Sequence, residues 1–336
     1  MGFDGCDIDE TSPVTSWLKT DGLGGVLLFD FDLPRGVYGK NLKDKIQIKR
    51  LNDDLNRYSS QSQSDIPLFI AIDYEGGAVD RLASVPGCMK TKKASAQALL
   101  SDEALHREAG NMASTLYELG FNLNFAPVVD LDLNHEQGII GKLGRSFSDN
   151  PYAVSHMAVQ FVNAFNQKKI ICAYKHFPGH GSALGDTHEG FVDVTETYLR
   201  SELIPYVELS SKLDLSLMIM TAHVINRQLD PEGLPATLSY PILTELLRKK
   251  LGFNGVIVSD DLQMHAISEH YRVDDALCLT INAGADMVIF GNQLGVISAT
   301  DVIDRIEQLV ISGAISSARI DEAYQRILML KRFIRQ

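Results

Sequence analysis

Seven short apolar runs recur along the chain, and each is separated from the next by a segment of helical pattern. The runs are apolar throughout and do not alternate with polar residues, which is typical of parallel strands covered on both faces. Strands that alternate with helices form right-handed βαβ units, and these build either an open doubly wound sheet or a closed eight-stranded barrel. The runs are GGVLLFDF (24–31), PLFIAIDYEGG (67–77), FNLNFAPVVD (121–130), IICAYKHF (170–177), LSLMIMTAH (215–223), GVIVSDD (255–261) and ADMVIFG (285–291).

The first residues of the chain favour the barrel. MGFDGCDIDE reads as the end of one more strand, which brings the number of strands to eight. We therefore predict an α/β fold, a single (β/α)8 TIM-like barrel whose first strand is truncated. No low-complexity linker, composition break or repeat marks a second folded unit, so we expect one barrel domain over residues 1–336.

Several helices have readable ends. Ser101 is expected to cap a helix that terminates at Gly120, because Ser accepts backbone N–H groups and Gly adopts the left-handed conformation. A second helix is predicted from Ser239 and Pro241 to Gly252, and residues 316–336 form a closing amphipathic helix.

Composition narrows the classes of partner. The chain carries 31 basic and 43 acidic residues, a net charge of −12, which disfavours nucleic acid and anionic membranes. No apolar run is long enough for a transmembrane helix, so no membrane partner is expected. Four scattered cysteines without CxxC spacing indicate free thiols. A small substrate that is neutral or weakly charged fits this composition.

Polar residues follow the apolar runs at their C-terminal ends. In a barrel those ends meet at one mouth, so residues distant in sequence would surround a single pocket. Each such residue by itself is also consistent with a strand cap or a solvated loop, but together they indicate a site. The residues are Asp73 and Glu75, Asp130 and Asp132, Lys175 and His176, His223, and Asp260 and Asp261.

The segment AYKHFPGHGSALGDTHEG (173–190) allows three interpretations. His176 and His180 have an HxxxH spacing that binds metals on a helix, but Pro178 and Gly179 lie inside it and disfavour a helix. PGHGSALG is rich in glycine, yet neither a Walker nor a dinucleotide motif is present to cradle phosphate. We therefore expect neither a metal nor a cofactor.

The third interpretation is glycoside hydrolysis, which needs one group at the anomeric carbon and a second that protonates the leaving oxygen. Asp260 ends a rigid strand and is suited to be the nucleophile. His188 lies two residues after Asp186, so an extended backbone places both side chains on one side, where the carboxylate orients the imidazole. A histidine with a near-neutral pKa can give and then take the proton.

Six sequence blocks carry a resemblance to a known family: IDYEGG, KHFPGHG, DTH, MTAHV, PATLS and LGFNGVIVSDDLQM. They resemble family 3 of the glycoside hydrolases, and are most similar to its bacterial β-N-acetylglucosaminidases (β-N-acetylhexosaminidases). The resemblance implies that Asp260 is the nucleophile of a retaining reaction with a covalent glycosyl-enzyme. It also implies that His188, paired with Asp186, is the acid/base on a mobile loop.

The same resemblance implies a set of residues that hold the hydroxyls of the terminal sugar. They are Asp73, Arg81, Arg145, Lys175 and His176. Ala78 stands where the family usually has Arg, and no proline follows the DTH triplet. Many members carry a C-terminal α/β sandwich domain as well, and we expect none in this chain.

Three alternatives stay open: a β-glucosidase of the same family, a phosphorolytic N-acetylglucosaminidase, and a catalytically silent sugar-binding barrel. The expected activity is exo-acting removal of terminal N-acetylglucosamine from β-linked glycans such as peptidoglycan fragments. We expect a carbohydrate substrate and a monomer. A cytoplasmic location is expected, or a periplasmic or exported one if a leader was removed.

Overall fold

A computed structural model describes residues 1–62, 66–187, 190–210 and 216–335, and its centre is a parallel sheet of seven strands. Neighbouring strands follow one another in sequence order, as βαβ units require, with Gly25 opposite Phe69 and Leu123 opposite Ile171. All seven predicted runs form these strands. They are β1 (Gly25–Leu27), β4 (Phe69–Ile72), β7 (Leu123–Asn124), β8 (Ile171–Phe177), β10 (Leu217–Thr221), β12 (Ile257–Asp261) and β13 (Met287–Ile289).

The first two residues of the chain join the edges of this sheet. The Met1 amino group donates to Gly25 O, Leu27 N donates to Met1 O, and Gly2 N donates to Phe290 O, beside β13. Met1 and Gly2 thus lie between β1 and β13, where the sequence predicted an additional strand. The curled sheet and this closure confirm the predicted TIM-like barrel.

Side chains alternate between the inside and the outside of the barrel, and both sides are apolar. On β4, Phe69 and Ala71 belong to the interior cluster, while Ile70 and Ile72 pack against the surrounding helices. Burial on both faces explains why the runs are apolar throughout.

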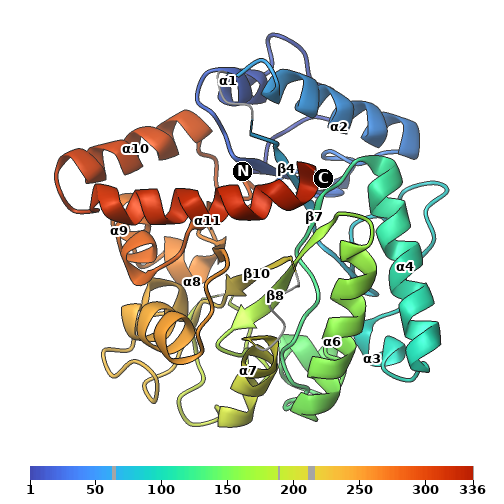
Figure 1. Cartoon of the computed structure of the whole chain (residues 1–336), viewed down its shortest axis with the longest axis vertical. Coiled ribbons are helices and arrows are strands. Elements are labelled where there is room, and N and C mark those ends of the chain that lie inside the picture. The colour runs from blue at the N-terminus through green and yellow to red at the C-terminus, as the bar shows by residue number, and fades with distance from the viewer. Residues whose placement is uncertain (63–65, 188–189, 211–215, 336) are drawn as a thin grey trace.

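Helices surround the sheet (Figure 1). The longer ones are α2 (Lys45–Ser59), α4 (Asp102–Leu119), α6 (Pro151–Asn166), η3 (Pro241–Lys250), α9 (Val273–Ala283), α10 (Ala299–Ile311) and α11 (Ser317–Arg335). The shorter ones are α1 (Pro13–Lys19), α3 (Ala94–Gln97), α5 (Ile139–Lys142), η1 (Arg200–Leu203), α7 (Ile204–Ser210), η2 (Ala236–Leu238) and α8 (His265–Ser268).

The predicted helix ends are confirmed. Ser101 Oγ accepts a hydrogen bond from Ala104 N at the start of α4, and Gly120 ends the helix with a φ of 87°. Ser239 Oγ accepts from Ile242 N at the start of η3, whose hydrogen bonding is of the π type.

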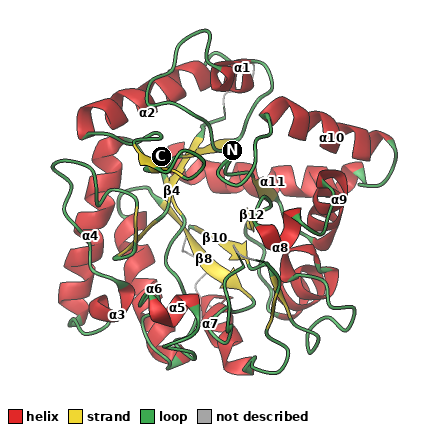
Figure 2. Ribbon diagram, turned by 180° about the vertical axis from the view of Figure 1, so that it is seen from behind, coloured by secondary structure: helices red, strands yellow, loops and turns green. Residues whose placement is uncertain are grey.

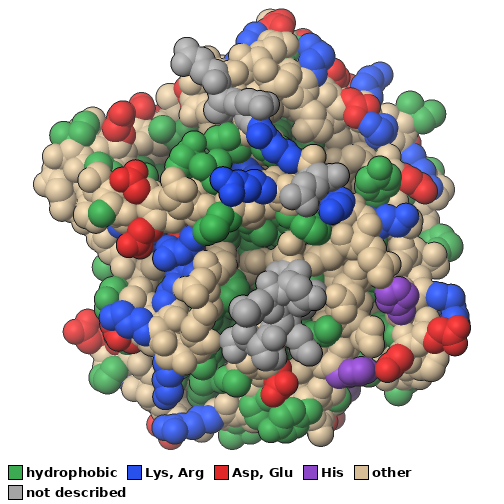
Figure 3. Space-filling view, viewed as in Figure 1, with side chains coloured by type: hydrophobic (Ala, Val, Ile, Leu, Met, Phe, Trp, Pro, Cys, Tyr) green, Lys and Arg blue, Asp and Glu red, His purple; other side chains and the backbone are tan. Residues whose placement is uncertain are grey.

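Helix α11, the predicted closing helix, covers the end of the barrel where the strands begin (Figure 1). Its apolar side chains pack against the interior cluster, and Lys331 Nζ donates to Gly24 O and Pro67 O, next to the starts of β1 and β4. Burial lowers the pKa of Lys331 to about 7. Hydrophobic and basic side chains lie next to one another on this face (Figure 3). Within the described residues, no helix is both long and apolar enough to cross a membrane.

The other end of the barrel is covered by loops and short elements (Figure 2). Three two-stranded ribbons belong to these connections: β2 (Phe31–Asp32) with β3 (Val37–Tyr38), β5 (Tyr74–Gly76) with β6 (Val79–Asp80), and β9 (Val192–Asp193) with β11 (Val224–Ile225). The site lies among these connections.

Candidate active site

A cavity of about 340 Å3 opens where the strands end. Seven of the residues predicted for the site line it, although they come from distant parts of the sequence. They are Asp73, Arg81, Arg145, Lys175, His176, Asp186 and Asp260. The eighth, His188, lies outside the described residues. The structure therefore brings the described part of the predicted set into one place.

Glu75 organises the cations of this cavity. Arg145 donates to both of its carboxylate oxygens, at 2.8 and 2.7 Å, and Lys175 Nζ lies 2.7 Å from its Oε1. Lys175 also donates to Asp73 Oδ1 at 3.0 Å. Burial alone would raise the pKa of Glu75, but the charges of Arg145 and Lys175 outweigh it and hold that pKa well below its ordinary range.

The same cluster keeps its cations charged. Burial opposes the charge on Lys175, yet Asp73 and Glu75 raise its pKa above the ordinary value. Arg145, which is likewise buried, has its pKa raised by Glu75. The result is a fixed set of charged donors whose N–H groups are suited to polar ligands without a large net charge.

His176 is positioned by a carboxylate beneath it. Asp130 is buried, and its Oδ2 lies 2.7 Å from His176 Nδ1 while the backbone N–H of His176 also donates to it. Burial opposes the charge on Asp130, but His176 lowers its pKa below the ordinary value. Because Nδ1 faces Asp130, Nε2 is the ring nitrogen that this contact leaves for a ligand.

The Gly-rich segment after β8 is shaped by close backbone packing. A Cβ on Gly181 would lie 2.0 Å from Leu131 O, and Gly179 has a φ of 132°. Glu202 Oε2 accepts the backbone N–H groups of Gly181 and Ser182, which holds the turn from behind. Burial raises the pKa of Glu202 to about 7. Close packing and backbone conformation therefore require glycine at these two positions.

Asp260 lies at the end of β12, where its backbone N–H donates to Thr221 Oγ1 at 3.4 Å. Its Oδ1 accepts the backbone N–H of Asp261 at 2.8 Å. The backbone carbonyl of Asp261 is in turn 2.9 Å from His223 Nε2, and His223 Nδ1 is 2.8 Å from Thr237 Oγ1. Hydrogen bonds from β10 and its following loop thus fix the backbone that carries Asp260.

The Asp261 carboxylate differs from that of Asp260. It accepts the backbone N–H groups of Gln263 and Gly291, and burial raises its pKa to about 6.

A family model assigns the chain to a known group. The model described as the glycosyl hydrolase family 3 N-terminal domain matches residues 6–330. The chain belongs to glycosyl hydrolase family 3.

Curated relatives in family 3 share about a third of their residues with this chain. Beta-hexosaminidase A of Pseudoalteromonas piscicida is 36% identical over 283 residues, which cover 80% of this chain and 45% of that protein. Beta-hexosaminidase of Tolumonas auensis is 35% identical over 312 residues, which cover 90% of this chain and 85% of that protein.

A solved structure agrees with the fold. The family 3 beta-N-acetylglucosaminidase of Paenibacillus sp. str. FPU-7 superimposes with a TM-score of 0.86 at 30% identity, covering 99% of this chain and 60% of that one. The chain thus spans about half of the length of the first relative and three fifths of this one.

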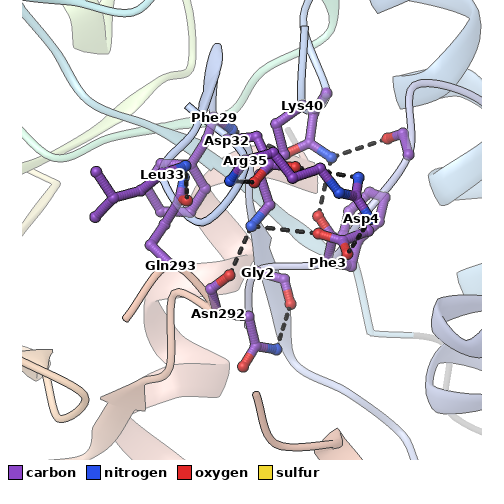
Figure 4. Close-up of polar contacts among 12 residues, drawn as sticks. Gly2, Phe3, Asp4, Phe29, Asp32, Leu33, Arg35, Lys40, Asn292 and Gln293 are labelled. Atoms are coloured by element: carbon purple, nitrogen blue, oxygen red, sulfur yellow. Dashed lines mark hydrogen bonds and ion pairs between the residues drawn. The ribbon is translucent and has the colours of Figure 1, made fainter. Parts of the chain in front are cut away.

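One wall of this family 3 cavity was not predicted. It is formed by the β2–β3 hairpin and the loop after β13, and its apolar lining includes Phe31 and Leu33, together with Ile139 of α5 and Leu143 just after it. Gln293 ties the two parts of the wall together. Its Oε1 accepts Leu33 N (Figure 4), and its Nε2 donates to Phe31 O. Apolar residues near a strand end carry no sequence signal that separates a cavity wall from ordinary core.

Proposed function

We propose that this chain is a glycoside hydrolase, a retaining and exo-acting β-N-acetylglucosaminidase. The observation that carries the proposal is a single cavity. It is lined by Asp260 and Asp186 and by Arg145 and Lys175, the two cations that pair with Glu75. Support comes from relatives that are named beta-hexosaminidases and from the Paenibacillus structure.

In the first step, the Asp260 carboxylate attacks the anomeric carbon and the bond from that carbon to the aglycone oxygen breaks. His188 protonates the leaving oxygen. In the second step, His188 takes a proton from water, the water oxygen attacks the anomeric carbon, and the glycosyl–Asp260 bond breaks. Two inversions give net retention. Asp186 supports the charged form of His188, which is present before the first step and is restored by the second.

The terminal sugar is held by Asp73, Arg81, Arg145, Lys175 and His176. Lys175 and Arg145 are already paired with carboxylates, so they offer N–H donors to neutral hydroxyls at little net charge. This arrangement favours an uncharged ring such as N-acetylglucosamine in the innermost position. We propose β-linked glycans such as peptidoglycan fragments as substrates.

The test is release of nitrophenol from the β-N-acetylglucosaminide and from the β-glucoside. We expect activity on the N-acetylated substrate, loss of at least a thousandfold in kcat for Asp260→Ala, and a large loss for His188→Ala. Azide added to Asp260→Ala should restore turnover and give the α-glycosyl azide, because azide replaces the missing nucleophile.

Matched controls are Asp53→Ala on α2 and His135→Ala, both exposed and outside the cavity, which should keep full activity. Preference for the glucoside, or a fully active His188→Ala, would contradict the proposal. Product analysis with and without inorganic phosphate separates hydrolysis from phosphorolysis, since phosphorolysis yields the sugar 1-phosphate.

A further inference from the structure

A buried network of hydrogen bonds connects β10 and η2 with the strand that carries Asp260. Its members are Thr221 at the end of β10, His223 two residues later and Thr237 of η2, and all three are completely buried. Thr221 Oγ1 lies 2.7 Å from Thr237 Oγ1, which in turn lies 2.8 Å from His223 Nδ1. The proposed reaction steps give none of these three side chains a role.

Both ends of the network reach the residues around the nucleophile. At one end, the backbone N–H of Asp260 donates to Thr221 Oγ1 at 3.4 Å, which is the longest of these contacts. At the other end, His223 Nε2 lies 2.9 Å from Asp261 O. The network therefore leaves β12 at Asp260, passes through three side chains from another part of the barrel, and returns to β12 at Asp261.

The number of protons in the network determines the state of the histidine ring. A carbonyl oxygen only accepts, so His223 Nε2 must carry the proton of its hydrogen bond to Asp261 O. The Thr237 hydroxyl has a single proton and two acceptors within reach, Ala222 O at 2.9 Å and His223 Nδ1 at 2.8 Å. The position of this proton decides whether His223 is neutral or doubly protonated.

Two observations place the Thr237 proton on the side of the histidine. Ala222 O already accepts the backbone N–H of Thr237 at 3.1 Å, so it does not need a second donor. If the hydroxyl donated to Ala222 O instead, His223 Nδ1 would also have to donate, and the buried ring would carry a charge against a hydroxyl and a carbonyl, which are both neutral. Burying a charge against neutral groups is costly. A neutral ring with its proton on Nε2 avoids this cost and satisfies both ring nitrogens.

With this order of protons, all the hydrogen bonds of the network run in one direction. Asp260 N–H donates to Thr221, the Thr221 hydroxyl to Thr237, the Thr237 hydroxyl to His223 Nδ1, and His223 Nε2–H to Asp261 O. Hydrogen bonds that run head to tail polarise and strengthen one another. The network is therefore a stiff support for the backbone at Asp260 and Asp261.

The backbone of Asp261 sets the direction of the nucleophilic carboxylate. Its N–H donates to Asp260 Oδ1 at 2.8 Å, while the N–H groups of Gln263 and Gly291 hold its side chain and His223 holds its carbonyl. A rotation of this backbone would turn the N–H away from Asp260 Oδ1 and let the carboxylate rotate. An error of about 1 Å in the position of a reacting group can slow a reaction about a hundredfold.

We propose that His223 is a positioning residue for the nucleophile. As a neutral ring with its proton on Nε2, it holds the Asp261 carbonyl and thereby the orientation of the Asp260 carboxylate, and Thr237 selects this tautomer. The proposal rests on the proposed function, which assigns the nucleophile to Asp260. His223 does not belong to the described lining of the cavity, so disturbing it should slow the reaction and leave sugar binding unchanged.

The first test reads the tautomer directly and needs no substrate. Nitrogen-15 NMR of the histidine rings distinguishes a ring protonated on Nε2 from one protonated on Nδ1 and from the doubly protonated ring, and His223→Phe identifies the signals of His223 by their loss. We expect the Nε2–H tautomer in the parent protein at pH 7. Thr237→Val keeps the shape of the side chain but removes the hydroxyl, so the Nδ1 signal should move because that nitrogen loses its donor. An Nδ1–H tautomer or a doubly protonated ring in the parent would refute the proposal.

The second test separates the chemical steps from binding. Thr237→Val should lower kcat on the nitrophenyl β-N-acetylglucosaminide about ten- to a hundredfold, while the inhibition constant of N-acetylglucosamine stays within about twofold of the parent value. Thr237→Ser keeps the hydroxyl and should restore both kcat and the NMR signals. Thr280→Val on α9 is the matched control and should keep full activity, because Thr280 is also completely buried but its hydroxyl makes no hydrogen bond within the described residues.

Circular dichroism and thermal melting verify that each variant is folded. Thr221→Val removes the neighbouring hydroxyl and is the second variant, with a loss of kcat in the same direction, and the tautomer of the parent tests the proposal even if Thr237→Val unfolds. If Thr237→Val keeps the parent kcat, or loses no more than Thr280→Val, the positioning role is refuted while the loss of activity in Asp260→Ala still supports the proposed function. If the parent itself releases no nitrophenol from the N-acetylglucosaminide, the proposed function is refuted and the positioning role with it.

Discussion

Replacing Glu75 by Gln tests whether the cations of the cavity depend on one buried carboxylate. The Glu75 side chain is 3% exposed and faces Arg145 and Lys175, whose side chains are 10% and 4% exposed. The substitution keeps the shape but removes the negative charge with which both Arg145 and Lys175 pair, so Asp73 and Asp130 are left to balance the two cations. Removing one partner of a buried ion pair costs about 3–5 kcal/mol, a large share of the roughly 5–15 kcal/mol that stabilises a folded protein.

The effect should depend on pH with a definite sign. The pKa of Glu75 in the folded chain lies well below its ordinary value of 4.5. A carboxylate of this kind stabilises the fold above its ordinary pKa, and that contribution is lost as the pH falls toward the folded value. The difference in unfolding free energy between the parent and Glu75→Gln should therefore be largest near pH 7 and should shrink below about pH 4.5.

Urea unfolding, followed by circular dichroism and the fluorescence of Trp17, measures this difference. Glu103→Gln is the matched control, because Glu103 also pairs with an arginine, Arg107, but with a side chain that is 86% exposed. The control should show no measurable loss. If Glu75→Gln is as stable as Glu103→Gln at pH 7, the buried cluster does not hold the cations as we infer.

Three further outcomes follow from buried groups and close contacts. Glu202→Gln should flatten the pH dependence of stability, because the pKa of Glu202 in the folded chain, about 7, lies above the ordinary value of 4.5. Glu202 therefore favours the fold below pH 4.5 and loses that contribution, about 3 kcal/mol at most, as the pH rises through 7. Thermal melting of the parent and the variant across this pH range measures the difference. Gly181→Ala should lower the melting temperature by several degrees, because its Cβ would meet Leu131 O at 2.0 Å. Gly110→Ala on α4 should raise stability by about 0.5–1 kcal/mol, because the new Cβ would meet no described atom within 4 Å beyond its chain neighbours and the backbone of its own helix. Asp130→Asn should lower kcat/KM about tenfold, with the folded content checked by circular dichroism, because the ring of His176 loses its charged partner.

The strands of the barrel could be predicted from the sequence because they depend on a local pattern. A parallel strand buried on both faces needs an apolar run, and the chain carries seven such runs between helices with clear caps. The rule that strand ends meet at one mouth then places Asp73, Lys175 and Asp260 in one cavity without knowledge of any contact.

The contacts that individual side chains make within the site could not be predicted from the sequence. The sequence shows Glu75 as a polar residue after a strand, but its pairing with Arg145 joins residues 70 positions apart. Nothing in the local sequence of Glu202 indicates that it accepts the backbone N–H groups of Gly181 and Ser182. The roles of His188 and its partner Asp186 stay predictions from the sequence.

The sequence by itself determined the barrel, the order of its strands and the end at which the chemistry lies, because periodicity, caps and strand polarity act over a few residues or follow from general rules of βαβ topology. Only the tertiary structure decided which carboxylate neutralises which cation, and how the β2–β3 hairpin forms one wall of the cavity. These properties depend on distances between residues far apart in the chain, and on the loss of water around them, which no local pattern records.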